Sequence, residues 1–298
     1  NIGFSAKVPI LIGGRCSVVS WMLSGRNSMP VVHHLKLEIA GRTVEFDMEL
    51  DPGFAQDRAL LFCMRQFGSC EPEVEAVMAR VLEEGDVAVD AGAAVGFFTL
   101  LMAKLVGEDG TVLAIEPGAN NLSKLRENIR INALQDYVFV TEDPLWSCAI
   151  QKPFFMTQDS GYNSLVMFDQ QVLSQTVRPT TTLSKVIGAR KPKLLKIDCE
   201  GAEFEIIRDD RVMTDLNYQI PYVIMELNEG ALKAAGSSPD EVRKRMRQHG
   251  YEMFALHRDG SLPTYLAPTS NLRYGKPNLN VLFSTMGEVL KAWPEIQL

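Results

Sequence analysis

An aspartate and two glycines stand where a short apolar segment gives way to a helical pattern. The apolar segment 87–90 ends in Asp90, and Gly92 and Gly96 follow before the helical pattern begins. Glycines allow a tight backbone turn and the close approach of a ligand. A dinucleotide fingerprint, G-x-G-x-x-G, would need a glycine where Ala94 stands. A carboxylate at position 90 would also repel a pyrophosphate, but it suits a ligand with an ammonium and a sulfonium group, such as S-adenosylmethionine.

An acidic residue about 20 residues beyond such a glycine loop can accept hydrogen bonds from a ribose diol. Glu116, followed by Pro117, fits this distance. Taken alone, an Asp-x-Gly can be an ordinary turn and a Glu-Pro an ordinary strand end. Their order along the chain favours a nucleoside site. Its expected residues are Asp90, Gly92, Ala93, Gly96, Glu116, Pro117 and Asp198.

The segment after the third predicted strand is expected to pass the adenine edge, by analogy with other doubly wound folds. We expect Glu142 or Asp143 to accept a hydrogen bond from the adenine amino group, with Leu145 or Trp146 against the ring. The alternative interpretation is an exposed acidic turn.

Two acids follow the fourth and fifth predicted strands. Asp198 ends the segment 194–198, and Glu226 lies near the end of 222–227, with Asn228 two residues on. Adjacent parallel strands end side by side, so these groups should meet. They would serve either as a base for an acceptor hydroxyl or as oxygen ligands of Mg²⁺. The alternative for Asp198 is a helix cap.

Four further charged or titratable residues belong to this part of the analysis. Glu200 and Glu203 fit the first turn of the following helix, where the helix dipole favours acids. His257 follows the sixth predicted strand and is a second candidate base, with surface exposure as the alternative. Lys196 shares a strand face with Asp198 and is expected to pair with a nearby acid.

Strand and helix patterns alternate from residue 86 onward. Strands are expected at 87–90, 111–116, 138–140, 194–198, 222–227, 251–256 and 280–284. This alternation predicts an α/β fold with a doubly wound, mostly parallel, Rossmann-like sheet covered by helices on both faces. A hairpin at 34–48 and a helix at 56–64 precede it. The chain therefore divides into an N-terminal α+β extension, 1–70, and a main domain, 71–298.

These motifs resemble the FkbM-type methyltransferases. That family has an Asp-x-Gly-Ala-Asn-x-Gly loop, a Glu-Pro after the second strand and a Lys-Ile-Asp-x-Glu-Gly-Ala-Glu run. The last is present here from Lys196 to Glu203, whereas Ala94 replaces the loop asparagine. The segment 161–165 also resembles the family. The resemblance implies methyl transfer from S-adenosylmethionine, usually to an oxygen of a sugar, lipid, polyketide or other small metabolite.

Composition limits the other classes of function. The net charge of −7 and a pI near 5.3 argue against a nucleic-acid partner. Five scattered cysteines without a C-x-x-C pair indicate reduced thiols in a cytoplasmic protein. The apolar segment 8–23 is interrupted by Gly13, Gly14 and Arg15 and is too short to span a membrane. Two alternatives stay open, an N-methyltransferase and a nucleoside-binding oxidoreductase, as does assembly into a homo-oligomer.

Overall fold

The computed structural model describes residues 5–12 and 15–22 as backbone, together with residues 29–168, 170–208, 219–270, 272 and 278–296. Among these residues, no helix combines the length and the apolar character needed to cross a membrane. The segment 259–277 lies partly outside the described residues, and its content of Pro, Ser, Gly and Asn favours a long loop. Its described part also contains a short strand, β13 (Thr264–Leu266), which this composition does not indicate.

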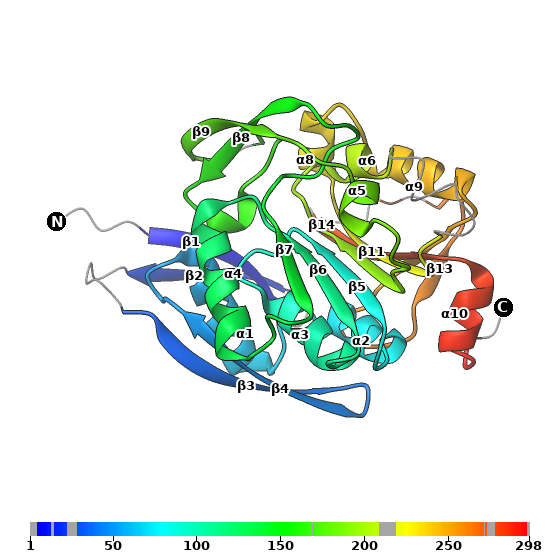
Figure 1. Ribbon diagram of the computed structural model, residues 1–298, viewed down its shortest axis with the longest axis horizontal. Coiled ribbons are helices and arrows are strands. Elements are labelled where there is room, and N and C mark those ends of the chain that lie inside the picture. The colour runs from blue at the N-terminus through cyan, green and yellow to red at the C-terminus, as the bar shows by residue number, and fades with distance from the viewer. Residues whose placement is uncertain are drawn as a thin grey trace.

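An eight-stranded sheet forms the centre of the protein, in the order β13-β12-β14-β11-β10-β5-β6-β7 (Figure 1). Its strands from β11 to β7 pair in parallel, whereas β14 is antiparallel to both β11 and β12. The doubly wound, mostly parallel prediction is therefore confirmed. The remaining strands of this sheet are β5 (Val87–Ala91), β6 (Thr111–Ile115), β7 (Val138–Thr141), β10 (Leu194–Ile197), β11 (Tyr222–Asn228), β12 (Glu252–Ala255) and β14 (Asn278–Ser284).

Helices cover both faces because the central strands are apolar on both sides, as parallel sheets require. On one face, a hydrophobic cluster joins the sheet to α2 (Pro72–Val81), α3 (Phe97–Val106), α4 (Ala119–Ile131) and α10 (Met286–Ala292). A second cluster on the other face involves α5 (Leu183–Ile187), α6 (Glu203–Ile206) and α9 (Pro239–Gln248). The short helix α8 (Glu229–Ala234) follows β11 directly.

The N-terminal part contains the predicted hairpin and helix. The hairpin pairs β3 (Val31–Ile39) with β4 (Arg42–Leu50), and α1 (Ala55–Phe67) follows; β1 (Ser5–Ile12) and β2 (Arg15–Met22) form a separate hairpin. Alternate side chains of β3 and β4 are buried in the same cluster as α2 and α3. This hairpin therefore completes the core of the main sheet instead of folding around a core of its own.

A further hairpin lies between β7 and α5 and was not predicted. It consists of β8 (Gln151–Thr157) and β9 (Val172–Pro179), with the one-turn helix η1 (Ser160–Tyr162) between them. Most of β9 is exposed, and β8 contains Pro153, so neither strand has the regular apolar alternation that identifies a half-buried strand. This hairpin matters because its connection covers the carboxyl ends of the parallel strands.

One buried ion pair ties α1 to α4. The Lys124 ammonium lies 2.6 Å from Oδ2 of Asp57, whose side chain is fully buried. Asp57 also accepts a hydrogen bond from the backbone N–H of Asp51, at 2.7 Å. A buried carboxylate is stable only when it is paired, so this contact fixes α1 over the edge of the sheet.

We expect the substitution Lys124→Met to lower the free energy of unfolding by about 3 kcal/mol, because it leaves the Asp57 carboxylate buried without its partner. Chemical denaturation measures this change. The control is Arg130→Met on the same helix, which removes an exposed pair with Glu127 and should leave stability unchanged. Equal stability losses in the two variants would show that the buried pair has no special weight.

Candidate active site

The carboxyl ends of β6, β5 and β10 meet through their backbones. The N–H groups of Gly92 and Ala93 both donate to the carbonyl of Ile115, and the N–H of Asp198 donates to the carbonyl of Ala91, each at 3.0 Å. A pocket of about 630 Å³, including the open space at its mouth, lies beyond these ends. Its place, outside the carboxyl ends of the parallel strands, is where ligands bind in open α/β sheets.

Gly92 is required by the close approach of two strand ends. Its φ is +87°, a value that favours glycine, and a Cβ at this position would lie 1.8 Å from the carbonyl oxygen of Asp198. Any side chain here would push the loop after β5 away from the end of β10. The tight turn predicted at Gly92 is therefore needed because the backbone of Asp198 lies against it.

Glu116 organises the loop after β5. Its Oε2 accepts from the N–H of Ala94 at 2.8 Å, and its Oε1 accepts from the N–H of Gly118 at 2.7 Å. Burial raises the pKa of Glu116 to about 7, while these backbone hydrogen bonds oppose the rise. Each carboxylate oxygen has a second lone pair. Glu116 also lines the pocket, so it can still accept hydrogen bonds from a ligand.

The walls of the pocket include several residues that the sequence analysis did not single out. They come from α1, from α4 and from β8 with the turn that follows it, and they are Gln56, Asn121, Phe154 and Ser160. No motif spacing connects these positions, because α1 and the β8–β9 hairpin reach the pocket only through the tertiary fold.

The turn between β8 and β9 is fastened on three sides. Ser160 donates to Gln56 of α1 at 3.0 Å, and Asn163 donates to Asn120 of α4 at 3.0 Å. Ser164 donates to the carbonyl of Glu200 at 2.9 Å. The segment 161–165, which the sequence analysis connected with the family, therefore closes one side of the pocket.

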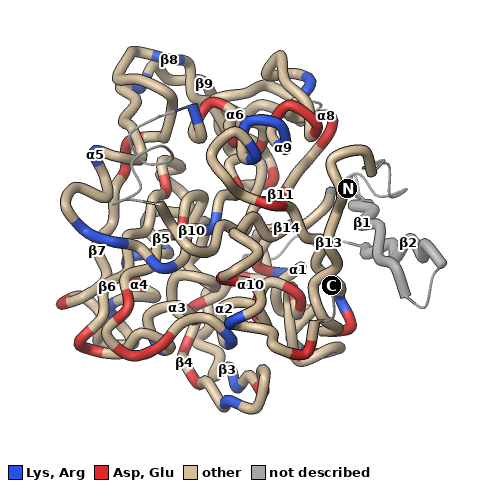
Figure 2. The backbone as a smooth tube through the Cα atoms, turned by 90° about the vertical axis from the view of Figure 1, so that its right-hand side faces the viewer, with Lys and Arg blue, Asp and Glu red and all other residues tan. Residues whose placement is uncertain are grey.

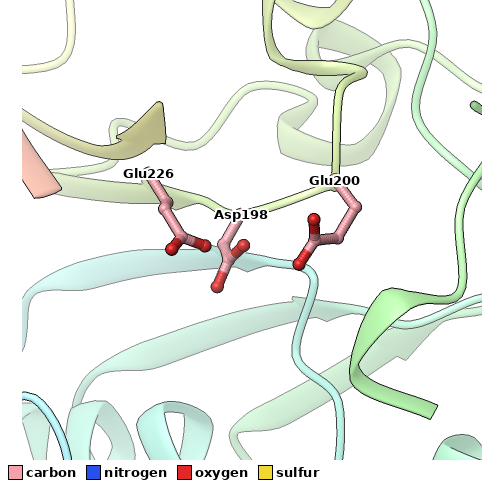
Figure 3. Close-up of side chains that lie close together, drawn as sticks. All are labelled: Asp198, Glu200 and Glu226. Atoms are coloured by element: carbon pink, nitrogen blue, oxygen red, sulfur yellow. The ribbon is translucent and has the colours of Figure 1, made fainter. Parts of the chain in front are cut away.

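Three carboxylates gather at the ends of β10 and β11. One oxygen from each of Asp198, Glu200 and Glu226 lies within 4.8 Å of the others. Figure 3 shows Asp198 between the other two, with Glu226 extending from β11 and Glu200 from the loop after β10. The predicted meeting of Asp198 and Glu226 is therefore present, and Glu200 joins them. Glu200 has a φ of +50°, a strained value for a residue with a side chain.

Lys196 provides a cation beside these acids. Its side chain is almost completely buried, and its ammonium lies 3.0 Å from Oδ2 of Asp198, whose side chain is about 26% exposed. The ammonium also lies 4.9 Å from the ring centroid of Phe98 on α3. The predicted pairing of Lys196 with a nearby acid is thus present. Asp198 does not cap α6, because Ala202 is the N-cap residue.

Burial and charge separate the pKa values of this group. Burial alone would raise the pKa of Asp198, but the Lys196 ammonium and the hydrogen bond with Glu226 outweigh it and leave that pKa below its ordinary value. Burial and the neighbouring Asp198 hold the pKa of Glu226 well above its usual range. Burial and Asp198 also raise the pKa of Glu200 to about 9. At neutral pH, Asp198 is therefore the ionised member.

The cluster contains carboxylate oxygens of the kind that magnesium binds, and it also has an ammonium beside it. The Lys196 ammonium already contacts one of these acids, Asp198. The predicted third metal ligand, Asn228, is not part of the three-carboxylate cluster. It uses its side-chain oxygen to cap α8 by accepting from the N–H of Ala231 at 3.1 Å.

Other acids at this end of the sheet stabilise the chain itself. Figure 2 shows acidic residues on α6, β11 and α8. Glu203, at the start of α6, accepts from the N–H groups of Cys199 and Gly201, both at 2.9 Å. This is the helix-start role expected for Glu203, whereas Glu200 lies in the carboxylate cluster instead.

Several predicted site residues lie away from the pocket. Of the predicted cofactor residues, Gly92, Glu116, Pro117, Leu145 and Asp198 line it. Asp90 is fully buried, and its Oδ2 accepts from Thr99 at 2.6 Å. Ala93 and Gly96 are buried in the turn behind the pocket. The expected direct contacts of these three residues with a ligand are therefore not supported by their positions.

Of the four residues predicted to lie beside the adenine, Leu145 is the one that lines the pocket. Pro144 lines it as well. Glu142 is exposed and forms an ion pair with Arg126. Trp146 packs under the Lys152 ammonium, 4.0 Å from its ring centroid, and Asp143 is not among the lining residues. For Glu142, the alternative of an exposed acidic turn describes the structure better.

His257 lies at the far side of the sheet from Asp198. It follows β12, which is separated from β10 by β14 and β11. Its Nε2 lies 2.8 Å from the hydroxyl of Thr264 at the exposed β12–β13 turn. It is not among the residues that line the pocket. Its surface interpretation therefore fits better than a role as base.

A doubly wound sheet with a ligand pocket at its carboxyl edge defines the class as an α/β enzyme of the nucleoside-binding type. The family model described as "Methyltransferase FkbM domain" matches residues 90–253, more than half of the chain. The chain belongs to the FkbM methyltransferase family. The resemblance drawn from the sequence motifs is thus confirmed.

Solved structures similar to this chain are distant from it. A methyltransferase FkbM from Methylobacillus flagellatus KT is 16% identical, with a TM-score of 0.42, and the match covers 76% of this chain and 53% of that one. A fibrillarin from Aeropyrum pernix in complex with S-adenosyl-L-methionine is 12% identical, with a TM-score of 0.40 and coverage of 88% and 85%. An rRNA methylase from Streptococcus thermophilus is 11% identical, with a TM-score of 0.41 and coverage of 71% and 93%. No curated protein matches the chain significantly.

We expect Ala94→Gly to raise the free energy of unfolding by about 0.5–1 kcal/mol. Ala94 has a φ of +50°, which costs a residue with a Cβ about 1–2 kcal/mol, and part of the gain is offset by the freedom of glycine in the unfolded chain. Asn should also be tolerated, because asparagine enters this region readily. The neighbouring Ala93→Gly is the matched control, since Ala93 has no positive φ, and it should lower stability. A loss of stability in Ala94→Gly would show that the backbone at Ala94 is not strained.

Proposed function

We propose that this protein transfers a methyl group from S-adenosylmethionine to a hydroxyl oxygen of a small-molecule acceptor, such as a sugar, a lipid or a polyketide-like compound. The observation that carries the proposal is the Asp198–Glu226 pair beside the pocket, with Lys196 against it. A hydroxyl acceptor must lose its proton, and this pair is placed to take it. An amine acceptor needs less help from a base, so an N-methyltransferase would have less use for such a pair.

The lining of the pocket suits the cofactor. Three acidic side chains, Glu116, Asp198 and Glu200, line it, the pKa of Asp198 is below its ordinary value, and no basic side chain is present among the described lining residues. Such a surface favours a ligand with positive charge over a pyrophosphate, which supports S-adenosylmethionine over a dinucleotide. Glu116 would hold the ribose hydroxyls through its remaining lone pairs, with Leu145 beside the base. When bound, the cofactor supplies an electrophilic methyl group on a sulfonium.

The residues of this chain would then perform two tasks. Backbone contacts between the loop after β5 and Asp198 fix the distance from the cofactor loop to the proton acceptor, and such positioning provides a large part of the acceleration in transfer reactions. The Asp198–Glu226 pair would take the hydroxyl proton onto a carboxylate oxygen as the new C–O bond forms and the methyl C–S bond of the sulfonium breaks, which leaves S-adenosylhomocysteine. Lys196 offsets the negative charge that the pair carries before it accepts that proton.

The ribose contact is tested with Glu116→Ala. Hydrogen bonds to a charged group contribute about 1.5–3 kcal/mol each, so affinity for S-adenosylhomocysteine should fall at least about tenfold. Titration calorimetry measures this, with NADH expected not to bind to the parent. Glu45→Ala, an exposed acid on β4, is the control and should bind normally. Unchanged affinity in Glu116→Ala would place the ribose elsewhere.

The proton acceptor is tested with Asp198→Asn, which should fold, bind S-adenosylhomocysteine and lose at least about 100-fold in turnover. Turnover is followed as release of S-adenosylhomocysteine from S-adenosylmethionine with panels of alcohol and amine acceptors. A variant that turns over at the parent rate with a hydroxyl acceptor would exclude Asp198 as the acceptor of the proton.

The pH profile and a chelator distinguish a proton-sharing pair from a metal. Burial and Asp198 raise the pKa of Glu226, so the pair gives up its second proton only well above the ordinary carboxyl range. The strongly basic form exists above that pKa, and the rate should therefore rise with pH through it. EDTA should leave the rate unchanged. Loss of activity with EDTA and its recovery with Mg²⁺ would support the metal instead.

A further inference from the structure

Glu71 is a carboxylate outside the family match that reaches the same side of the sheet as the candidate site. It immediately precedes α2, and its Oε2 accepts from the side-chain amide of Asn280 at 3.0 Å. The same amide donates to Oε1 of Glu73 at 3.2 Å. Asn280 thus holds two acids from the start of α2 against β14.

The strand register places this contact beside the candidate site. Asn280 of β14 is the direct partner of Glu226 on β11, so the two side chains stand on the same face of the sheet. Lys196 and Asp198 share that face, since Lys196 is in register with Ile224, two residues before Glu226. Glu71 is therefore brought next to the Asp198–Glu226 pair by a neighbouring strand.

The Lys196 ammonium is the group that these acids have in common. It is buried, and an ammonium without balancing charge in such a place is strongly destabilised. Burial would lower the pKa of Lys196, but Asp198, Asp90 and Glu71 together outweigh it and raise that pKa. The titratable groups around it are Asp90 on β5, Asp198 and Glu200 after β10, Glu226 on β11, and Glu71 and Glu73 at the start of α2, with Arg258 beyond them, its Nε 3.7 Å from Glu73.

Glu71 and Glu73 differ in what balances them. Glu73 has its own cation, Arg258. Burial raises the pKa of Glu71 to about 7, and the Lys196 ammonium is the largest influence that opposes this rise. The negative charge of Glu71 is therefore balanced by Lys196, whereas that of Glu73 is balanced by Arg258.

We propose that Glu71 is a positioning residue for the methyl transfer, supplying part of the negative charge that holds the buried Lys196 ammonium beside Asp198. The inference rests on the proposed role of Asp198 as proton acceptor. It extends the working site beyond the family domain to a residue that the domain does not contain. Without Glu71, Lys196 would retain Asp198 and Asp90 but would lose the acid that joins it to α2 and β14.

The test uses the ligand-free protein with ¹⁵N-labelled lysine, observed at pH 8, where Glu71 is ionised. A buried, hydrogen-bonded ammonium exchanges its protons slowly and gives an ammonium signal that exposed lysines lack. Lys196→Met assigns this signal. We expect Glu71→Gln, which keeps the shape and removes the charge, to reduce the signal to less than about a tenth of its parent intensity. Glu71→Asp, which keeps the charge, should restore part of it.

Glu73→Gln is the matched control, because Glu73 also accepts from the Asn280 amide. In this variant the Lys196 ammonium signal should equal that of the parent. If Glu71→Gln does not fold, Asn280→Ser is used, because it releases Glu71 from its donor and should also weaken the signal. A full ammonium signal in whichever of these two variants is used, or equal losses in Glu71→Gln and Glu73→Gln, would overturn the proposal. Binding of S-adenosylhomocysteine to the parent is measured separately, so failure of the proposed function is distinguishable from failure of this inference.

Discussion

The arrangement of the site depends on one buried ammonium. Lys196 lies among carboxylates from three strands and from the start of α2, and without it these acids would repel one another in a medium that screens charge poorly. Because the ammonium contacts Asp198 directly, the pKa of Asp198 is below its ordinary value, whereas burial and Asp198 raise that of Glu226. The same contact therefore sets apart the two acids of the proposed proton transfer.

Close packing of the loop after β5 against the end of β10 places this group of charges beside the pocket. Gly92 allows the loop after β5 to touch the backbone of Asp198, and Glu116 holds the other side of that loop through two N–H groups. The β8–β9 turn then closes the pocket from above the strand ends, anchored to α1, α4 and the loop after β10. The proposed cofactor residues and the proposed proton acceptor are thus held by the same few strand ends, which suits a transfer that depends on distance.

The parts of the site that could be predicted are those encoded within one strand and its following loop. Asp198 and Glu226 follow apolar strands, so the parallel sheet brings them together; Gly92 and Glu116 follow from loop chemistry and spacing. Residues supplied by distant segments could not be found this way. Gln56, Ser160 and Glu71 reach the site through tertiary contacts that no local pattern encodes. An asparagine after a strand suits a helix cap as well as a metal, and Asn228 caps the helix that begins at the next residue.

The most direct test of this account is a crystal structure of the protein with S-adenosylhomocysteine, grown at neutral pH with Mg²⁺ present. The account predicts the ribose hydroxyls on Glu116, the sulfur facing Asp198, and the Lys196 ammonium still in contact with Asp198, with no metal among the three carboxylates. A nucleoside bound away from the ends of β5 and β6, or a magnesium ion that displaces Lys196 from Asp198, would contradict it.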